Sequence, residues 1–230
     1  MTPIVTRKAV VFDVGGVIVR WQPLQLMREH LPMVAADEAY AKVFQSWAPG
    51  ADWLAFDRGT VEPDELAERI ARRTGYPRAA IASLIDAIGA HLEPMRDSVA
   101  LIARVRAAGH PLGLLSNMPR PYADHLEAAH DCFGWFDHLA WSGRLGLVKP
   151  DRAFFDHVLE QLAVAPAQAV FIDDHIGHVE AARRYGWQAL HFESAAQVER
   201  QLAERGWLNH ACASRTHIVA PSGIKSSLKS

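Results

Sequence analysis

VVFDVGGVIV, residues 10–19, is the stretch that decides the fold of this chain. Its apolar run ends at a single carboxylate, Asp13, and the chain then breaks at Gly15 and Gly16. Such a run is typical of a strand buried on both faces of a parallel sheet. Ligands of open α/β sheets bind outside the carboxyl ends of the strands, so Asp13 stands where chemistry is usually found. A turn in which Asp13 only caps exposed amides fits this stretch equally well.

The composition predicts a soluble, cytoplasmic protein. The chain has 230 residues, of which 50% are hydrophobic, so it can bury a core and is not disordered throughout. Its formal net charge of -2 gives no global basic field for binding nucleic acid. Two distant cysteines, Cys132 and Cys212, exclude a disulfide scaffold and a cysteine zinc site. No apolar stretch approaches the length of a membrane span, so we expect neither a membrane nor a nucleic acid as partner.

The pattern after the first strand predicts a helical block inserted into an α/β fold. Helices are expected at 23–31, 37–47, 63–74 and 77–88, the second capped by Asp37. Asp97 is expected to cap the next helix, after which strands at 111–115, 169–172 and 187–192 alternate with helices, with a short apolar piece around 138–141. The order predicts a Rossmann-like parallel-sheet core over 1–19 and 93–210, with a small helical domain at 20–92. A frayed or disordered tail is expected at 211–230.

Polar side chains follow the predicted strands at the points where they end. They are Asp13, Ser116, Asn117, Asp173 and Asp174, and Lys149 opens an intervening helix. Parallel neighbours would bring this set together at one edge of the sheet. Several carboxylates with a hydroxyl and an ammonium suit phosphoryl chemistry on Mg²⁺, and carboxylates packed together without a cation would repel. Each residue alone has an ordinary explanation as a helix cap, a turn residue or a solvated lysine. Their joint occurrence favours a site.

The set resembles the haloacid dehalogenase superfamily of phosphohydrolases over roughly residues 8–192. By this resemblance the helical block is a cap domain, and Asp13 is the nucleophile that forms an aspartyl-phosphate. Ser116 would bind the phosphoryl group with Asn117 beside it, and Lys149 would offset the charge of nucleophile and phosphate. The resemblance also implies a Mg²⁺ site, whose ligands would be Asp13, the carbonyl of Gly15, Asp173 and Asp174.

Gly15 departs from the usual pattern of this superfamily. Most of its phosphatases carry a second aspartate there, which protonates the leaving oxygen, and such assistance is worth roughly 10²- to 10⁴-fold in rate. A similar branch, which includes sugar-phosphate phosphatases acting on glucose 1-phosphate, also carries glycine. A substrate with a good leaving group or a proton donor from the cap would compensate. Asp57 and Arg58, in the turn before Gly59, are the candidates for facing a substrate, although an exposed charged turn is the more ordinary interpretation.

His175 and His178 form a second departure, because similar proteins often carry asparagine at the second position. A histidine pair beside Asp174 could indicate a transition metal. A hydrogen bond behind the metal ligands, or a surface position, is the more ordinary role.

The leading hypothesis is a Mg²⁺-dependent phosphatase acting on a small phosphorylated metabolite, with a sugar phosphate as the expected substrate. A 2-haloacid dehalogenase is the alternative enzyme, but displacing halide from carbon has no use for a metal-binding acidic pair. A phosphoryl-accepting receiver module would carry its acidic pair early in the chain, whereas here the pair comes last. A phosphate-metabolite binder that lost catalysis with the change to Gly15 is the fourth interpretation.

Overall fold

Five parallel strands form the central sheet of the computed structural model, which describes residues 8–44 and 51–208. Their order across the sheet is β3-β2-β1-β4-β5, and each neighbouring pair is parallel. The strands are β1 (Ala9–Phe12), β2 (Leu112–Ser116), β3 (His138–Trp141), β4 (Ala169–Asp173) and β5 (Gln188–His191). The predicted Rossmann-like parallel sheet is therefore confirmed.

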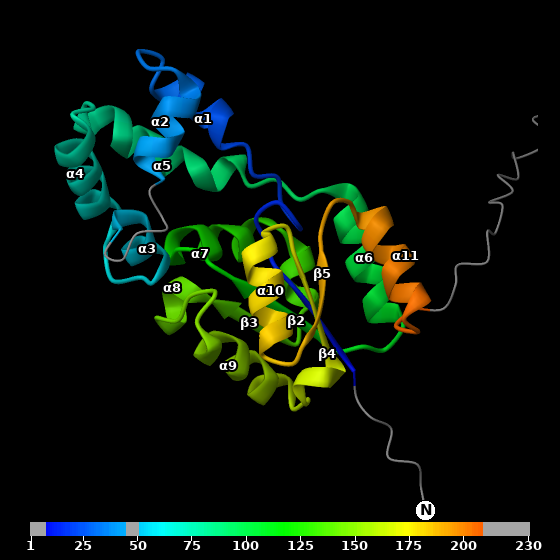
Figure 1. Ribbon diagram of the computed structural model, residues 1–230. Coiled ribbons are helices and arrows are strands. Elements are labelled where there is room, and N and C mark those ends of the chain that lie inside the picture. Colours follow the sequence, from blue (N-terminus) through cyan, green and yellow to red (C-terminus); the bar gives the residue numbers. More distant parts are fainter. Residues whose placement is uncertain (1–7, 45–50, 209–230) are drawn as a thin grey trace, which may run out of the picture.

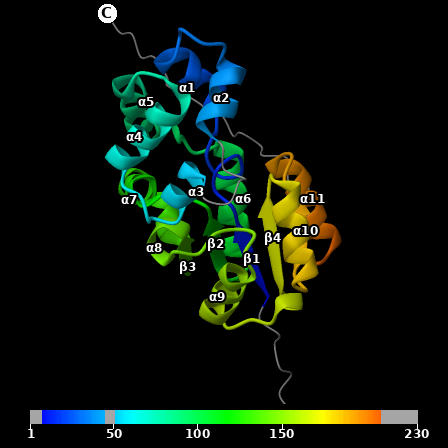
Figure 2. The same cartoon turned by 60° about the vertical axis from the view of Figure 1, so that its left-hand side comes forward.

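Helices cover both faces of the sheet, which explains why its central strands are continuous apolar runs. One face packs against α6 (Arg96–Ala107), α7 (Arg120–Ala129) and α11 (Ala195–Glu204). The other packs against α9 (Arg152–Leu162) and α10 (Ile176–Arg184). Figure 2 shows β1 in the middle of this arrangement. Short helical turns complete the core: η1 (Asp131–Trp135), α8 (Ser142–Leu145) and η2 (Pro166–Gln168).

Within the described ranges, five further helices lie between β1 and α6, and we call them the inserted helices. They are α1 (Pro23–His30), α2 (Ala36–Val43), α3 (Asp52–Asp57), α4 (Pro63–Thr74) and α5 (Arg78–His91). In Figure 1, α1, α2, α4 and α5 gather to one side of the sheet, while α3 lies close to the core helices. The contacts of α3 with α8 place it over the carboxyl ends of the strands.

The chain leaves the sheet and returns to it along two paired segments. The backbone N–H of Arg20 donates to the carbonyl of Glu93 at 2.9 Å, and that of Met95 donates to the carbonyl of Ile18 at 2.8 Å. The predicted domain limits at 19/20 and 92/93 fall beside these bonds. The division into core and cap stays a prediction, and the predicted tail at 211–230 lies outside the described residues.

Two predicted helix caps are wrong. Asp37 and Asp97 lie in the first turns of α2 and α6, whose N-cap residues are Ala35 and Met95. A carboxylate anywhere in the first turn interacts favourably with the helix dipole, so an aspartate marks the start of a helix more reliably than its cap. The short helices α3 and α8 were not predicted, because so few turns carry no usable periodicity. The predicted end of the second helix at Trp47 lies outside the described residues.

Candidate active site

Asp13 lies at the carboxyl end of the central strand β1, where the order of the strands in the sheet reverses. It follows β1 directly, and its backbone N–H donates to the carbonyl of Ile172 in β4 at 2.9 Å. Asp173 ends β4, the neighbour of β1. The two carboxylates are therefore brought side by side at the position where open α/β sheets bind ligands.

Lys149 bridges these two carboxylates. Its Nζ lies 2.8 Å from Oδ1 of Asp13 and 2.7 Å from Oδ2 of Asp173, and its side chain is 1% exposed. Burial alone would lower the pKa of Lys149, but the two carboxylates hold it above its ordinary value. The lysine thus stays charged, as its predicted role requires.

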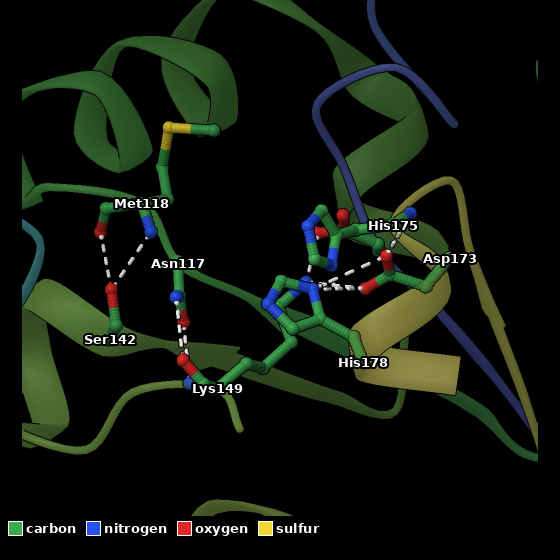
Figure 3. A network of polar contacts seen from close by, with 8 residues as sticks. Asn117, Met118, Ser142, Lys149, Asp173, His175 and His178 are labelled. Carbon is green, nitrogen blue, oxygen red and sulfur yellow. Dashed lines mark hydrogen bonds and ion pairs between the residues drawn. The ribbon is translucent and has the colours of Figure 1, made fainter. Parts of the chain in front are cut away.

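Asn117 holds Lys149 in place through the backbone. The side-chain Nδ2 of Asn117 donates to the carbonyl of Lys149 at 3.1 Å, and the N–H of Lys149 donates to Oδ1 at 2.7 Å. Figure 3 shows this pair of bonds. Ser116, the last residue of β2, is 2% exposed and lines the same cavity. Both residues lie at the predicted site, with the amide of Asn117 engaged by the loop that carries Lys149.

Asp173 is held by a histidine as well as by Lys149. Its Oδ1 accepts from the backbone N–H of His175 at 2.7 Å, and Nδ1 of His178 lies 3.2 Å from Oδ2. The centroids of the two imidazole rings are 4.5 Å apart, and Figure 3 shows both side chains beside Asp173. Burial would raise the pKa of Asp173, but Lys149 and His178 hold it below its usual range. His178 therefore forms a hydrogen bond with an acidic residue of the site, which is one of the two more ordinary roles expected for it.

Three carboxylates could hold a metal ion here. One oxygen from each of Asp13, Asp173 and Asp174 lies within 4.8 Å of the others. Hard carboxylate oxygens suit Mg²⁺. Gly16 has a φ of +75°, and a Cβ at this position would collide with the carboxylate of Asp174, so glycine permits the close approach. Burial raises the pKa of Asp13 to about 6 although Lys149 opposes the shift, and a bound cation would favour the ionised form.

A cavity of about 440 Å³ separates this cluster from the inserted helices. Asp57 and Arg58 both line it. Asp57 is the last residue of α3 and is only 7% exposed, and burial raises its pKa to about 8 against the influence of Lys149. The interpretation of this segment as an exposed charged turn is therefore wrong for Asp57.

Contacts on both sides of Asp57 fasten α3 to the core. The Oγ of Ser142 donates to the carbonyl of Asp57 at 2.6 Å and accepts from the N–H of Met118 at 2.8 Å. Arg58 forms an ion pair with Asp151 at 2.9 Å. Gly59 has a φ of +70°, and a Cβ there would collide with the backbone of the α8 turn. Ser142 was not predicted, although it follows β3 at the same edge and the strand-end argument would have found it.

A family model confirms what this geometry suggests. The model described as haloacid dehalogenase-like hydrolase matches residues 7–186. The chain belongs to the haloacid dehalogenase-like hydrolases. The predicted family and hydrolase class are thus confirmed, and none of the helices in the described ranges is long and apolar enough to cross a membrane.

Known haloacid dehalogenase-like hydrolases similar to this chain include phosphatases and dehalogenases. The sesquiterpene phosphatase astK of Aspergillus oryzae is 29% identical, covering 81% of this chain and 90% of that protein. A family member from Bacteroides thetaiotaomicron, crystallised as a magnesium complex, has a TM-score of 0.67 at 17% identity over 84% of this chain and 98% of its own. The L-2-haloacid dehalogenase of Xanthobacter autotrophicus has a TM-score of 0.63 at 22% identity, over 86% and 83%.

In the present protein, the space around Gly15 is open. A Cβ built on Gly15 would meet nothing within 4 Å. Glycine is therefore not required there for packing. The position where the resemblance predicts a second aspartate therefore has room for a side chain.

Proposed function

We propose that this protein is a Mg²⁺-dependent phosphatase that hydrolyses a small phosphate monoester through an aspartyl-phosphate on Asp13. The supporting observation is the buried carboxylate of Asp13, which lines the 440 Å³ cavity with the ammonium of Lys149 2.8 Å away. Phosphatase chemistry is also the activity in the name of the relative astK. Within this class the sequence predicts a sugar phosphate, through the branch that carries glycine at position 15.

The first step is attack of an Asp13 carboxylate oxygen on phosphorus. The new bond is an acyl phosphate, and the bond that breaks joins phosphorus to the oxygen of the leaving alcohol. Lys149 offsets the negative charge that gathers on Asp13 and the phosphoryl oxygens, and Ser116 donates to the phosphoryl group. Asn117 positions Lys149 through the two backbone bonds described above.

The acidic cluster fits the metal that this chemistry needs. Asp13, Asp173 and Asp174 would supply carboxylate oxygens, and Gly15, which lines the same cavity, would supply its backbone carbonyl. When bound, Mg²⁺ would neutralise charge on the phosphoryl oxygens.

Asp57 supplies the proton that Gly15 cannot. Asp57 lines the cavity, and its carboxyl lies close enough to Lys149 to feel the charge of that lysine. The raised pKa of about 8 keeps this carboxyl protonated at neutral pH. In the first step Asp57 donates its proton to the leaving oxygen. In the second, its carboxylate takes a proton from the water that attacks phosphorus and breaks the acyl phosphate. The inserted helices would then act as a cap that contributes the general acid.

Replacing Asp57 with asparagine should slow the enzyme in proportion to how much the leaving group needs a proton. For butyl phosphate we expect kcat/KM to fall by roughly 10²- to 10⁴-fold. For 4-nitrophenyl phosphate, whose leaving group is stable as an anion, the loss should be less than tenfold by the same reasoning. A carboxyl with a pKa of about 8 loses its proton above that pH, so wild-type turnover of butyl phosphate should fall there and the variant's should not.

Two further variants separate acid catalysis from a structural effect. Asp52→Asn changes another carboxyl of the same helix, one that forms an ion pair with Arg73. This variant should keep the wild-type ratio of kcat/KM for butyl phosphate to kcat/KM for 4-nitrophenyl phosphate. Because the space at Gly15 is open, adding Gly15→Asp to the Asp57→Asn variant should restore turnover of butyl phosphate. An equal loss for both substrates in Asp57→Asn, without rescue, would contradict the role of Asp57 as the acid.

Removing the metal tests the phosphatase against the two remaining hypotheses. Phosphate release from 4-nitrophenyl phosphate should fall to background in EDTA and return on addition of Mg²⁺, because the acidic cluster then regains its cation. Chloride release from a 2-haloacid by the metal-free protein would favour a dehalogenase instead. Binding of phosphate monoesters without any turnover would favour a binder that has lost catalysis.

A further inference from the structure

Part of the cavity wall is built from aromatic rings of the inserted helices and the segment before them. Trp21 and Phe44 meet edge to face with centroids 5.5 Å apart, and Phe44 and Trp53 meet at 4.3 Å. All three line the cavity. Tyr40 extends the row, 5.3 Å from Phe44, and is 38% exposed. The aromatic surface therefore runs from the interior to the solvent.

Aliphatic side chains complete this wall, and polar ones are scarce on it. Leu54, Ile88 and Leu92 line the cavity beside the rings. Among the described lining residues from Trp21 to Leu92, Asp57 and Arg58 are the charged ones. Arg58 is already paired with Asp151 at 2.9 Å. A sugar would bury several hydroxyl groups against this surface, and each hydroxyl without a partner would weaken binding.

The cavity thus has two ends of different chemistry. Asp13, Lys149 and Asp174 make the end at the sheet, which suits a phosphate with its metal, and the aromatic and aliphatic side chains make the other. Its volume of about 440 Å³ lies within the usual range for small-molecule sites. A ligand that satisfies both ends carries a phosphate on an apolar body.

We infer that the substrate is the phosphate monoester of an apolar alcohol, with a long alkyl or isoprenoid-like chain against the aromatic wall. The inference rests on the proposed phosphatase function, and it replaces the sugar phosphate as the expected substrate. Because an alkoxide leaves poorly, such a substrate also needs a proton donor, which agrees with the role proposed for Asp57.

A series of n-alkyl phosphates from butyl to decyl tests the inference. If each added methylene is buried against the wall, kcat/KM should rise by up to about fourfold per methylene until the cavity is filled. Decyl phosphate should also be a better substrate than glucose 1-phosphate. A flat or falling series, or a preference for glucose 1-phosphate, would overturn the inference.

Matched variants and a binding measurement make the result specific. Leu54→Gln places a polar side chain in the wall and should flatten the series, whereas Leu24→Gln changes an exposed leucine of α1 that does not line the cavity and should not. Binding of n-alkylphosphonates, which cannot be hydrolysed, should show the same dependence on chain length by calorimetry. If binding depends on chain length but no phosphate is released, the phosphatase function alone is contradicted. If phosphate is released without any dependence on chain length, the apolar substrate alone is contradicted.

Discussion

Replacing Asp13 with asparagine should abolish phosphate release, with kcat for 4-nitrophenyl phosphate falling by roughly 10⁴-fold or more. The amide is close in shape to the carboxylate but cannot attack phosphorus, so the acyl phosphate does not form. The loss should appear with every substrate, whatever its leaving group. Phosphate release under saturating substrate measures the rate, and acid quenching with radiolabelled substrate measures the covalent intermediate.

Two comparisons show whether the lost group is the nucleophile. Asp156→Asn alters an exposed aspartate of α9 that pairs with Arg152, and it should react at the wild-type rate. Asp57→Asn should still form the labelled intermediate from 4-nitrophenyl phosphate, because this leaving group needs little protonation. Labelled protein or steady turnover in Asp13→Asn would exclude a mechanism through an aspartyl-phosphate on this residue.

Replacing Lys149 with methionine should both inactivate and destabilise the protein. Its ammonium bridges the buried carboxylates of Asp13 and Asp173, so its removal leaves two charges without their cation. Breaking a buried ion pair in this way costs about 3–5 kcal/mol of unfolding free energy. Urea unfolding in the absence of metal, followed by tryptophan fluorescence, measures this loss. Lys42→Met removes a lysine that is 47% exposed and should unfold like the wild type.

The destabilisation of Lys149→Met should depend on pH and on Mg²⁺. Without the lysine, burial and mutual repulsion raise the pKa of the two carboxyls above their value in the unfolded chain. The loss of unfolding free energy is therefore absent at pH values below the carboxyl pKa of the unfolded chain. It grows as the pH rises through the higher carboxyl pKa of the folded variant. Under the proposed function Mg²⁺ would bind the folded state, so adding it should recover part of the loss. Equal stability of variant and wild type at neutral pH without metal would show that Lys149 does not compensate these charges.

Much of the fold could be predicted because its signals are local. The helices Pro63–Thr74 and Arg120–Ala129 were predicted with the bounds that the structure has. Each is long enough, or sufficiently bounded by proline, glycine and polar residues, for its periodicity to be seen. The strand-end argument also anticipated the meeting of Asp13 with Asp173, since parallel strands carry their carboxyl ends to one edge.

The surroundings of Asp57 could not be predicted, because they depend on contacts between distant parts of the chain. Its carbonyl accepts from Ser142, 85 positions later in the sequence, and Arg58 pairs with Asp151 over 93 positions. The helix that carries Asp57 has six residues, too few for an amphipathic pattern. Nothing local distinguishes a buried carboxyl with a pKa of about 8 from an exposed one.

In VVFDVGGVIV the sequence by itself determined a buried strand, a carboxylate at its end and two glycines directly after it. The tertiary structure decided what surrounds them. It placed Lys149 between Asp13 and Asp173, and it brought Asp57 and several aromatic rings to the cavity that Asp13 lines. The physical reason is range: strands and helices follow from neighbours along the chain, whereas burial, pKa and the shape of a cavity arise only when distant segments pack together.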